Sequence, residues 1–301
     1  MSEPAIVVRQ QVSVLHALVS SSPDHFYLYD RAGRHLYASP AVAQSLGISQ
    51  ANFIGKTWQE LGFPAEVTER FDVERETVFR FGLPWRGELI LPTELGHRST
   101  VHDYILSPVH THDGSIEAVL VAARDITERK QVEADLQYQA LHDALTGLPN
   151  RTLLNDRLEQ SILAAHRSVG CIALLFLDLV DFKAVNDTVG HQGGDLLLQQ
   201  LADCWEEILR ASDTLSRVGG DEFVVLLPAT EVSGANDTAQ RLKMAIDRAF
   251  EIEGHRLHIG VSIGIAVHQG RDGDARALMQ EADRAMFRAK GQQKKRTSHA
   301  P

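Results

Sequence analysis

The chain has 301 residues, a length that accommodates about two domains, and its content of 44% hydrophobic and 23% charged residues is that of a globular protein. Its net charge of −10 argues against a nucleic-acid-binding protein, which would show a basic surface. The two cysteines, Cys171 and Cys204, are too few for a disulfide framework, so we expect a reducing, cytoplasmic location.

The N-terminal segment is apolar but interrupted. Arg9 and His16 are among the polar residues that break the run, whereas a membrane-spanning helix needs roughly 20 mostly apolar residues. The segment also lacks the basic start and the small-residue cleavage site of a signal peptide. We therefore expect no membrane segment, and an amphipathic helix within residues 1–20 that caps a domain or pairs with its own copy.

Residues 21–127 combine short alternating runs with turn signals, which predict strands and hairpins. The predicted strands are residues 25–30, 35–38, 85–91, 100–106 and 116–123, and the predicted helices are residues 41–46 and 69–81. Two strands, short helices and three more strands predict a small α+β domain with an antiparallel sheet.

This region resembles PAS sensor domains in its opening hairpin, its segment 52–56 and its ending at residues 123–127. The resemblance implies either a ligand sensor or a dimerisation scaffold without a ligand. The absence of cysteine from residues 21–127 excludes a flavin-photoadduct sensor. Haem needs an axial ligand, usually histidine, and a small apolar ligand fits equally well, so the ligand stays unknown. The candidate histidines are His25, His35, His97, His102, His110 and His112.

Residues 128–142 form a predicted helical linker. The segment is rich in Glu, Arg, Lys, Gln and Ala and contains no Gly or Pro, which favours a continuous exposed helix. Val132, Leu136 and Ala140 recur at four-residue spacing and form one apolar stripe. The linker is either a passive spacer or a dimer stalk that transmits rotation or register.

In the C-terminal half, residues 171–177 form a continuous apolar run, which predicts a strand buried on both faces. Asp178 follows directly, and a carboxylate at the exit of a buried strand is well placed as a metal ligand. The glycine-containing stretch after it leads into a predicted helix over residues 196–209.

Gly219-Gly220-Asp221-Glu222-Phe223 lies between two apolar runs and predicts a β-hairpin with a bare tip followed by two acids. A backbone without side chains at two positions allows close approach of a ligand. Acids beside that gap can hold a divalent cation, which in turn can hold a phosphate. Alone, the same residues would also suit an ordinary tight turn.

The remaining predicted elements complete the half. A helix covers residues 236–250, strands cover residues 255–258 and 259–268, and a last helix covers residues 274–289. The order is βαββαβ with additions, a ferredoxin-like sheet with helices on one face. The same arrangement forms the palm of nucleotide polymerases and class III nucleotide cyclases.

The predicted domain at residues 143–297 resembles the GGDEF family of diguanylate cyclases. The resemblance extends over residues 140–297 and joins the Asp-x-Leu-Thr-Gly-Leu-Pro-Asn-Arg opening, the intact residues 219–223 and the ending at residues 282–290. It implies that two GTP molecules on two facing domains, in a homodimer, condense to cyclic di-GMP with release of two pyrophosphates. Such a transfer needs positioning and charge neutralisation more than covalent catalysis.

The resemblance also implies roles for individual residues. Asp178, Asp221 and the Leu179 carbonyl correspond to ligands of Mg²⁺ or Mn²⁺, and Asp221 is either a base or only a ligand. Glu222 completes the catalytic pair. The residues implied in GTP binding are Phe182, Lys183, Asn186, His191, Asp195, Gly219, Gly220, Lys290 and Lys294.

Three details qualify this assignment. Asn186 and Asp195 are the implied guanine readers. Lys294 stands where the family often has arginine, so the bidentate fork is lost and a weaker phosphate grip is expected. Arg210-x-x-Asp213 matches an inhibitory product site, although a helix-end cation followed by a turn acid would look the same.

Two other functions compete with a sensor-regulated cyclase. One is a catalytically inactive cyclic di-GMP receptor or dimeric signalling scaffold that uses Arg210 and Asp213. The intact metal and phosphate groups argue against it. The other is a nucleotide cyclase with one substrate per site, which the guanine-reading pair disfavours.

Overall fold

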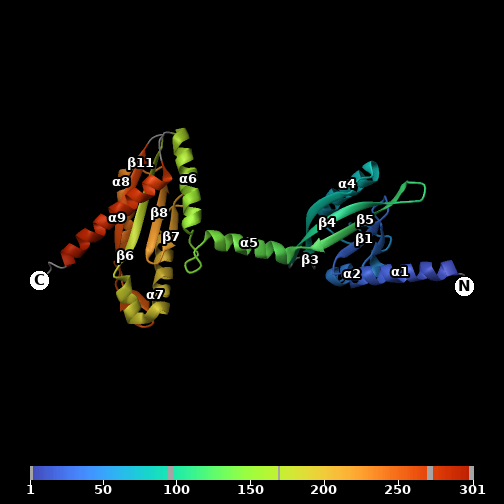
Figure 1. Cartoon of the computed structure of the whole chain (residues 1–301), viewed down its shortest axis with the longest axis horizontal. Coiled ribbons are helices and arrows are strands. Elements are labelled where there is room, and N and C mark those ends of the chain that lie inside the picture. Colours follow the sequence, from blue (N-terminus) through green and yellow to red (C-terminus); the bar gives the residue numbers. More distant parts are fainter. Residues whose placement is uncertain (1–2, 94–97, 169, 270–273, 298–301) are drawn as a thin grey trace. The chain divides into compact units, whose positions relative to one another are not determined.

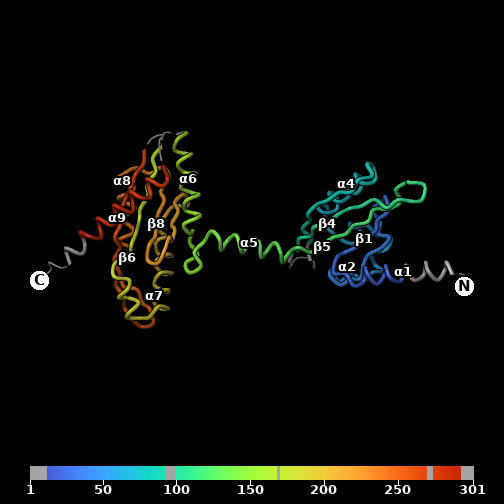
Figure 2. The backbone as a smooth tube through the Cα atoms, viewed as in Figure 1, coloured from blue at the N-terminus to red at the C-terminus, as the bar shows by residue number. Residues whose placement is uncertain are grey.

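A computed structural model describes residues 3–93, 98–168, 170–269 and 274–297 (Figures 1 and 2). The chain divides into two compact units, Met1–Ala134 and Asp135–Pro301, and the helix α5 (Thr127–Leu141) contributes to both. Within the described residues, no helix is long and apolar enough to cross a membrane.

The N-terminal unit is built on a five-stranded antiparallel sheet with the order β2-β1-β5-β4-β3. All five predicted strands are confirmed, and the last three run further than expected. The strands are β1 (His25–Tyr29), β2 (His35–Ala38), β3 (Trp85–Thr93), β4 (Arg98–His110) and β5 (Ile116–Asp125). His97, one of the candidate haem ligands, lies outside the described residues.

The N-terminal unit also contains the helices α1 (Glu3–Ser21), α2 (Pro40–Leu46), α3 (Gln50–Phe53) and α4 (Ala65–Phe81). The predicted helices correspond to α1, α2 and α4, whereas the short α3 was not predicted. Phe71 and Val78 on α4 are buried in the core with strand residues such as Tyr29 and Leu106. Gly82 ends α4 in the left-handed conformation, with φ 68°, and donates its N–H to Val78 O.

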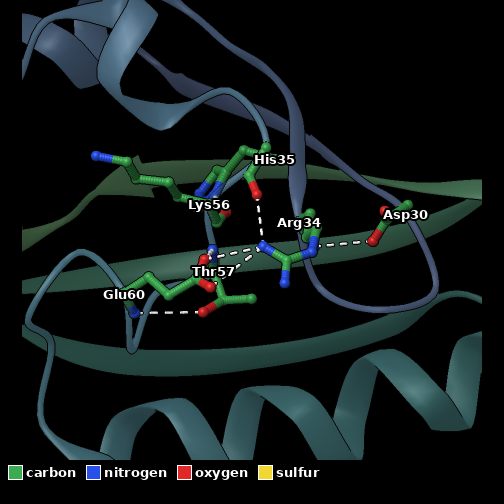
Figure 3. A network of polar contacts seen from close by, with 7 residues as sticks. Asp30, Arg34, His35, Lys56, Thr57 and Glu60 are labelled. Carbon is green, nitrogen blue, oxygen red and sulfur yellow. Dashed lines mark hydrogen bonds and ion pairs between the residues drawn. The ribbon is translucent and has the colours of Figure 1, made fainter.

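A polar network ties the β1–β2 hairpin to the segment between α3 and α4 (Figure 3). Arg34 Nη1 donates to Gly55 O at 2.7 Å and lies 3.0 Å from Glu60 Oε2. His35 adds a second contact between the hairpin and this segment, because its Nδ1 lies 2.6 Å from Lys56 O. These contacts give the family-like segment at residues 52–56 a structural role in anchoring the hairpin.

The C-terminal unit contains the predicted βαββαβ order and a four-stranded antiparallel sheet ordered β11-β6-β8-β7, which confirms the ferredoxin-like arrangement. Its sheet strands are β6 (Cys171–Val180), β7 (Thr214–Gly219), β8 (Glu222–Pro228) and β11 (Gly260–Gln269). Its helices are α6 (Arg151–Ser168), α7 (Phe182–Glu206), α8 (Val232–Ala245) and α9 (Ala275–Thr297). A separate small hairpin joins β9 (Phe250–Ile252) to β10 (His255–Leu257).

Helices cover both faces of this sheet, so the expectation of helices on one face was wrong. One core joins alternate β6 residues such as Leu175 to residues of α7 and α8, and a second joins Leu174 to residues of α6 and α9. The reason lies in β6 itself, whose interior is buried on both sides, as its continuous apolar run predicted.

Several predicted helix boundaries were wrong. Helix α4 begins at Ala65 rather than residue 69, and α9 continues to Thr297 rather than ending at residue 289. Helix α7 begins at Phe182 rather than residue 196, because its first half buries Val185 in the core; the kink falls at Gly190, with φ 74° and ψ 174°. Helix α8 ends at Ala245, and Phe250 starts β9 with its side chain in the same core.

The contact between β11 and α9 generates a stability prediction. A Cβ built on Gly264 would overlap backbone atoms of Met286 and Ala282, which cannot move aside as a flexible side chain would. We expect Gly264→Ala to lower the free energy of unfolding by about 1–3 kcal/mol, the usual cost of overpacking. Gly291→Ala is the matched control, because a Cβ there meets nothing within 4 Å. Equal denaturation midpoints for the two variants would contradict this packing.

Candidate functional site

The glycine-rich hairpin forms as the sequence predicts. Gly219 at the end of β7 pairs with Glu222 at the start of β8, so Gly220 and Asp221 form the tip. Gly220 has φ 35°, and both glycines are exposed. Asp221 and Glu222 are half-buried. Asp221 therefore lies at the tip and Glu222 directly after it, beside two glycines where a ligand can approach the backbone.

A buried acid from the central strand joins them. Asp178 on β6 is the register partner of Glu222 on β8, so their side chains share one face of the sheet. Asp178 is only 6% exposed. The Leu179 N–H donates to Asp221 O at 3.3 Å, which fixes the hairpin tip against the end of β6. The structure thus brings together all four residues predicted from the metal and catalytic motifs.

A lysine on helix α9, far along the chain from β6, balances the negative charge of Asp178. Lys290 on α9 places Nζ 2.7 Å from Asp178 Oδ1 and 2.9 Å from Oδ2. The hydrogen bond to Asp178 raises the pKa of Lys290. Burial raises the pKa of the Glu222 carboxyl, and the neighbouring Asp178 raises it further. Sequence reasoning assigned Lys290 to phosphate binding and did not predict this pair.

The start of α7 adds backbone donors beside Asp178. Asp181 precedes the helix with φ 60°, and its side chain makes no capping hydrogen bond. Phe182 and Lys183 are the first residues of the helix, where N–H groups have no intrahelical acceptor. Such a terminus, directly after the strand that carries the acid, suits an anion.

Asn186, one of the two implied guanine readers, lies next to Gly194, the residue before the other reader, Asp195. A Cβ on Gly194 would overlap Asn186 Oδ1, so the Asn186 side chain lies against the residue that precedes Asp195. Asp195 and His191 are exposed. An amide and a carboxylate are therefore presented from the two halves of one bent helix.

Arg217 is a residue that sequence reasoning missed. Its guanidinium donates to Gly220 O from Nε and Nη2, at 3.0 and 2.8 Å, and Nη1 lies 2.9 Å from Asp143 Oδ1. Burial alone would raise the pKa of Asp143, but hydrogen bonds from Arg217 and Thr146 outweigh it and lower the pKa. The arginine thus joins the hairpin tip to the segment before α6. Its position two residues before Gly219 is the sequence feature that could have identified Arg217 as part of the site.

The remaining predicted residues lie elsewhere. Arg210 and Asp213 sit between α7 and β7, where the Arg210 N–H donates to Asp213 Oδ2 at 3.0 Å. Both line a pocket of about 190 Å³ together with Arg241 on α8. Lys294 belongs to α9, but its side chain lies outside the described residues.

The donor set suits a hard divalent cation. Asp178 and Asp221 offer carboxylate oxygens and Leu179 a carbonyl, the ligand types that Mg²⁺ and Mn²⁺ prefer. Across the described part of the chain, however, no three His, Cys, Asp or Glu side chains are grouped closely enough to hold a metal. The types of ligand present, two carboxylates and one backbone carbonyl oxygen, nevertheless suit a divalent cation.

Two family models match the chain. The model of the GGDEF family, described as "Diguanylate cyclase, GGDEF domain", matches residues 140–296, and a PAS fold model matches residues 19–131.

Two curated relatives match parts of this chain. The bifunctional diguanylate cyclase/cyclic di-GMP phosphodiesterase MucR of Pseudomonas aeruginosa is 48% identical over 55% of this chain and 24% of MucR. The probable diguanylate cyclase DgcE of Escherichia coli K12 is 32% identical over 93% of this chain and 26% of DgcE. The chain thus spans about a quarter of the length of each.

Among solved structures, the coiled coil and GGDEF domain of DgcB from Caulobacter crescentus, in complex with c-di-GMP, has 25% identity and a TM-score of 0.51. The match covers 55% of this chain and 88% of that chain.

Arg217 generates a structural prediction. Arg217→Ala removes the hydrogen bonds to Gly220 O and the ion pair with Asp143, so both segments lose the same anchor. We expect faster amide hydrogen exchange at residues 219–222 and 143–150 together, measured by mass spectrometry. Arg210→Ala, an exposed arginine that precedes the same strand, is the control. Faster exchange in only one of the two segments would show that Arg217 does not couple them.

Glu222 generates a pH-dependent prediction. Its folded-state pKa is raised above the ordinary 4.5, so the charged carboxylate destabilises the fold at neutral pH. This cost disappears as pH falls below the ordinary value, because the group is then protonated in both states. We therefore expect Glu222→Gln to raise the melting temperature at pH 7 and to leave it unchanged at about pH 4. A pH-independent difference would contradict the assigned cause.

Proposed function

Since this chain belongs to the GGDEF family of diguanylate cyclase domains, with a PAS fold ahead of that domain, we propose that it is a sensor-regulated diguanylate cyclase. In this proposal it condenses two GTP molecules to cyclic di-GMP and releases two pyrophosphates. The observation that carries it is the meeting of Asp178, Asp221, Glu222 and Lys290 at the end of β6. A pure receptor needs no such group of acids beside a bare hairpin.

The proposed GTP site uses the geometry of α7. Asn186 and Asp195 read the guanine edge, since a carboxylate accepts from N1–H and N2–H₂ and an amide can meet O6 or N3. The amides of Phe182 and Lys183 and the Lys290 side chain hold the phosphates at the helix N-terminus. His191 contacts the substrate between the two readers, and Gly219 and Gly220 let it approach the hairpin.

In the proposed reaction, the 3′-hydroxyl of each GTP attacks the α-phosphate of the other. Asp178, Asp221 and the Leu179 carbonyl would hold divalent cations, Mg²⁺ or Mn²⁺. Such cations neutralise charge and favour the deprotonated hydroxyl. Asp221 lies at the hairpin tip and orients the reacting group, while Glu222 and Lys290 set the charge around Asp178. The transfer itself then depends on alignment.

Because one domain holds one GTP, the proposed enzyme is a homodimer. The stripe Val132, Leu136 and Ala140 on α5 supports this, since all three are exposed on a helix without Gly or Pro. We propose that α5 passes register or rotation between sensor and cyclase. We place the protein in the cytoplasm, where its free cysteines stay reduced.

The PAS ligand in this proposal is small or absent. A cavity lined by residues including Tyr27, Trp58 and His102 holds about 30 Å³, room for about one water molecule and not for haem. His25 and His35 are buried as well. His110 and His112 are exposed. A ligand larger than water would have to open this core.

We further propose that product inhibits the enzyme at the pocket of Arg210, Asp213 and Arg241. Two guanidinium groups and a carboxylate, around about 190 Å³ of space, suit the phosphates and guanine edges of a cyclic dinucleotide.

The function is tested by incubating the pure protein with GTP and Mg²⁺ and identifying the products by mass. We expect cyclic di-GMP and pyrophosphate from the wild type, and loss of turnover with an intact fold in Asp221→Asn, because a half-buried tip residue contributes little to the core. Activity of this variant within about tenfold of wild type, or about 1.4 kcal/mol, would refute the metal-ligand role. Binding of cyclic di-GMP without turnover by the wild type would favour the receptor.

Product inhibition has a separate test. Arg210→Ala should leave initial rates near normal, while its progress curves stay linear to higher product concentration than those of the wild type. The reason is that Arg210 is exposed and lies on the loop between α7 and β7 rather than beside Asp178. The measurement is the initial rate with cyclic di-GMP added at increasing concentration. Identical slowing of both proteins would exclude this pocket as the inhibitory site.

A further inference from the structure

Lys290 and Asp178 form an ion pair that the proposed reaction cannot retain unchanged. Nζ lies within 2.9 Å of both carboxylate oxygens, which are the atoms that would also bind a divalent cation. The Asp178 side chain is 8% exposed and the Lys290 side chain is 34% exposed. The acid is therefore held in place by the sheet, while the lysine has solvent on one side into which it can move.

The acidic residues around Asp178 explain why this carboxylate needs a cation beside it at all times. Glu222 is the register partner of Asp178. Burial raises the pKa of Glu222 most, the negative charges of Asp178, Asp221 and Asp283 raise it further, and Arg151 opposes them. A buried carboxylate without a counter-charge is strongly unfavourable. In the described structure the ammonium group of Lys290 meets this need.

We propose that Lys290 is the resident counter-ion of Asp178 and exchanges places with a divalent cation. In the nucleotide-free protein its ammonium group holds Asp178. When a divalent cation and a triphosphate enter together, Lys290 releases Asp178 and turns to the phosphates. This inference rests on the proposed function for the roles of Asp178 as metal ligand and Lys290 as phosphate ligand.

The exchange couples the two ligands. A cation that enters alone must displace a charged partner that then has no acid to contact. A cation that enters with a triphosphate leaves the ammonium group with a new anionic partner. Each ligand therefore raises the affinity for the other, by the same factor in both directions.

The test measures Mn²⁺ binding to the full-length, nucleotide-free protein by electron paramagnetic resonance of the free ion. Lys290→Met keeps the aliphatic stem and removes the charge, so we expect Mn²⁺ to bind about tenfold more tightly than to wild type. Lys290→Arg should restore weak binding, because the guanidinium keeps the charge. Lys243→Gln, which removes an exposed charge from α8, is the control and should bind Mn²⁺ as wild type does.

A second measurement adds a non-reactive GTP analogue, and its main result comes from wild type and does not depend on a variant that folds. Mn²⁺ titrations with and without a non-reactive GTP analogue should show much tighter Mn²⁺ binding in its presence, and in Lys290→Met this gain should shrink. Equal or weaker Mn²⁺ binding by Lys290→Met, or no gain with the analogue in wild type, would overturn the exchange.

Failure of the exchange is distinguishable from failure of the proposed function. Asp178→Asn tests the metal ligand directly, and unchanged Mn²⁺ binding by this variant would remove the metal assignment itself. Product identification by mass tests the reaction. A protein that makes cyclic di-GMP, but whose Mn²⁺ affinity does not respond to Lys290→Met, retains the function and loses the exchange.

Discussion

The C-terminal unit is organised around one electrostatic constraint, a carboxylate buried at the end of its central strand. Asp178 is 6% exposed, and its register partner Glu222 on the neighbouring strand is half-buried on the same face of the sheet, so two acids lie side by side with reduced access to water. Such an arrangement persists only if a cation is held against it. Lys290 meets that need from α9, which is 112 residues further along the chain. The position of α9 is therefore as important to the site as the hairpin.

The packing of the sheet determines where α9 lies. Since β6 is buried on both faces, the sheet needs helices on both sides, and α9 lies on the face opposite α7. Gly264 lets the α9 backbone approach β11 closely, which brings Lys290 within reach of Asp178. On the other face, α7 begins at Phe182, shortly after β6 ends at Val180, so its first amides follow Asp178 closely along the chain. One strand thus positions an acid, a cation and a helix N-terminus.

Local patterns predicted most of this fold, and the failures share a cause. The strands and the hairpin tip at Gly220 followed from alternation, apolar runs and glycine. The first half of α7 was missed because Gly190, Gly193 and Gly194 resemble a loop, whereas burial of Val185 and close packing beside Asn186 keep it helical. The Lys290–Asp178 and Arg217–Asp143 pairs join residues 112 and 74 positions apart, so no local pattern contains them. A motif predicts which residues serve a site, but the charge balance between them depends on tertiary contacts.

A continuous set of hydrogen bonds leads from the end of α5 to the hairpin tip. Asn150 Nδ2 donates to Ala140 O at 2.8 Å, and Tyr138 donates its hydroxyl to Gly147 O at 3.3 Å, so the last turns of α5 are attached to the segment before α6. Asp143 in that segment holds Arg217, which in turn donates to Gly220 O. The residue after Gly220 is Asp221, whose carbonyl accepts the Leu179 N–H. These contacts attach the last turns of α5 and the hairpin tip to the same segment, residues 143–150, so the linker helix and the glycine-rich turn share one anchor.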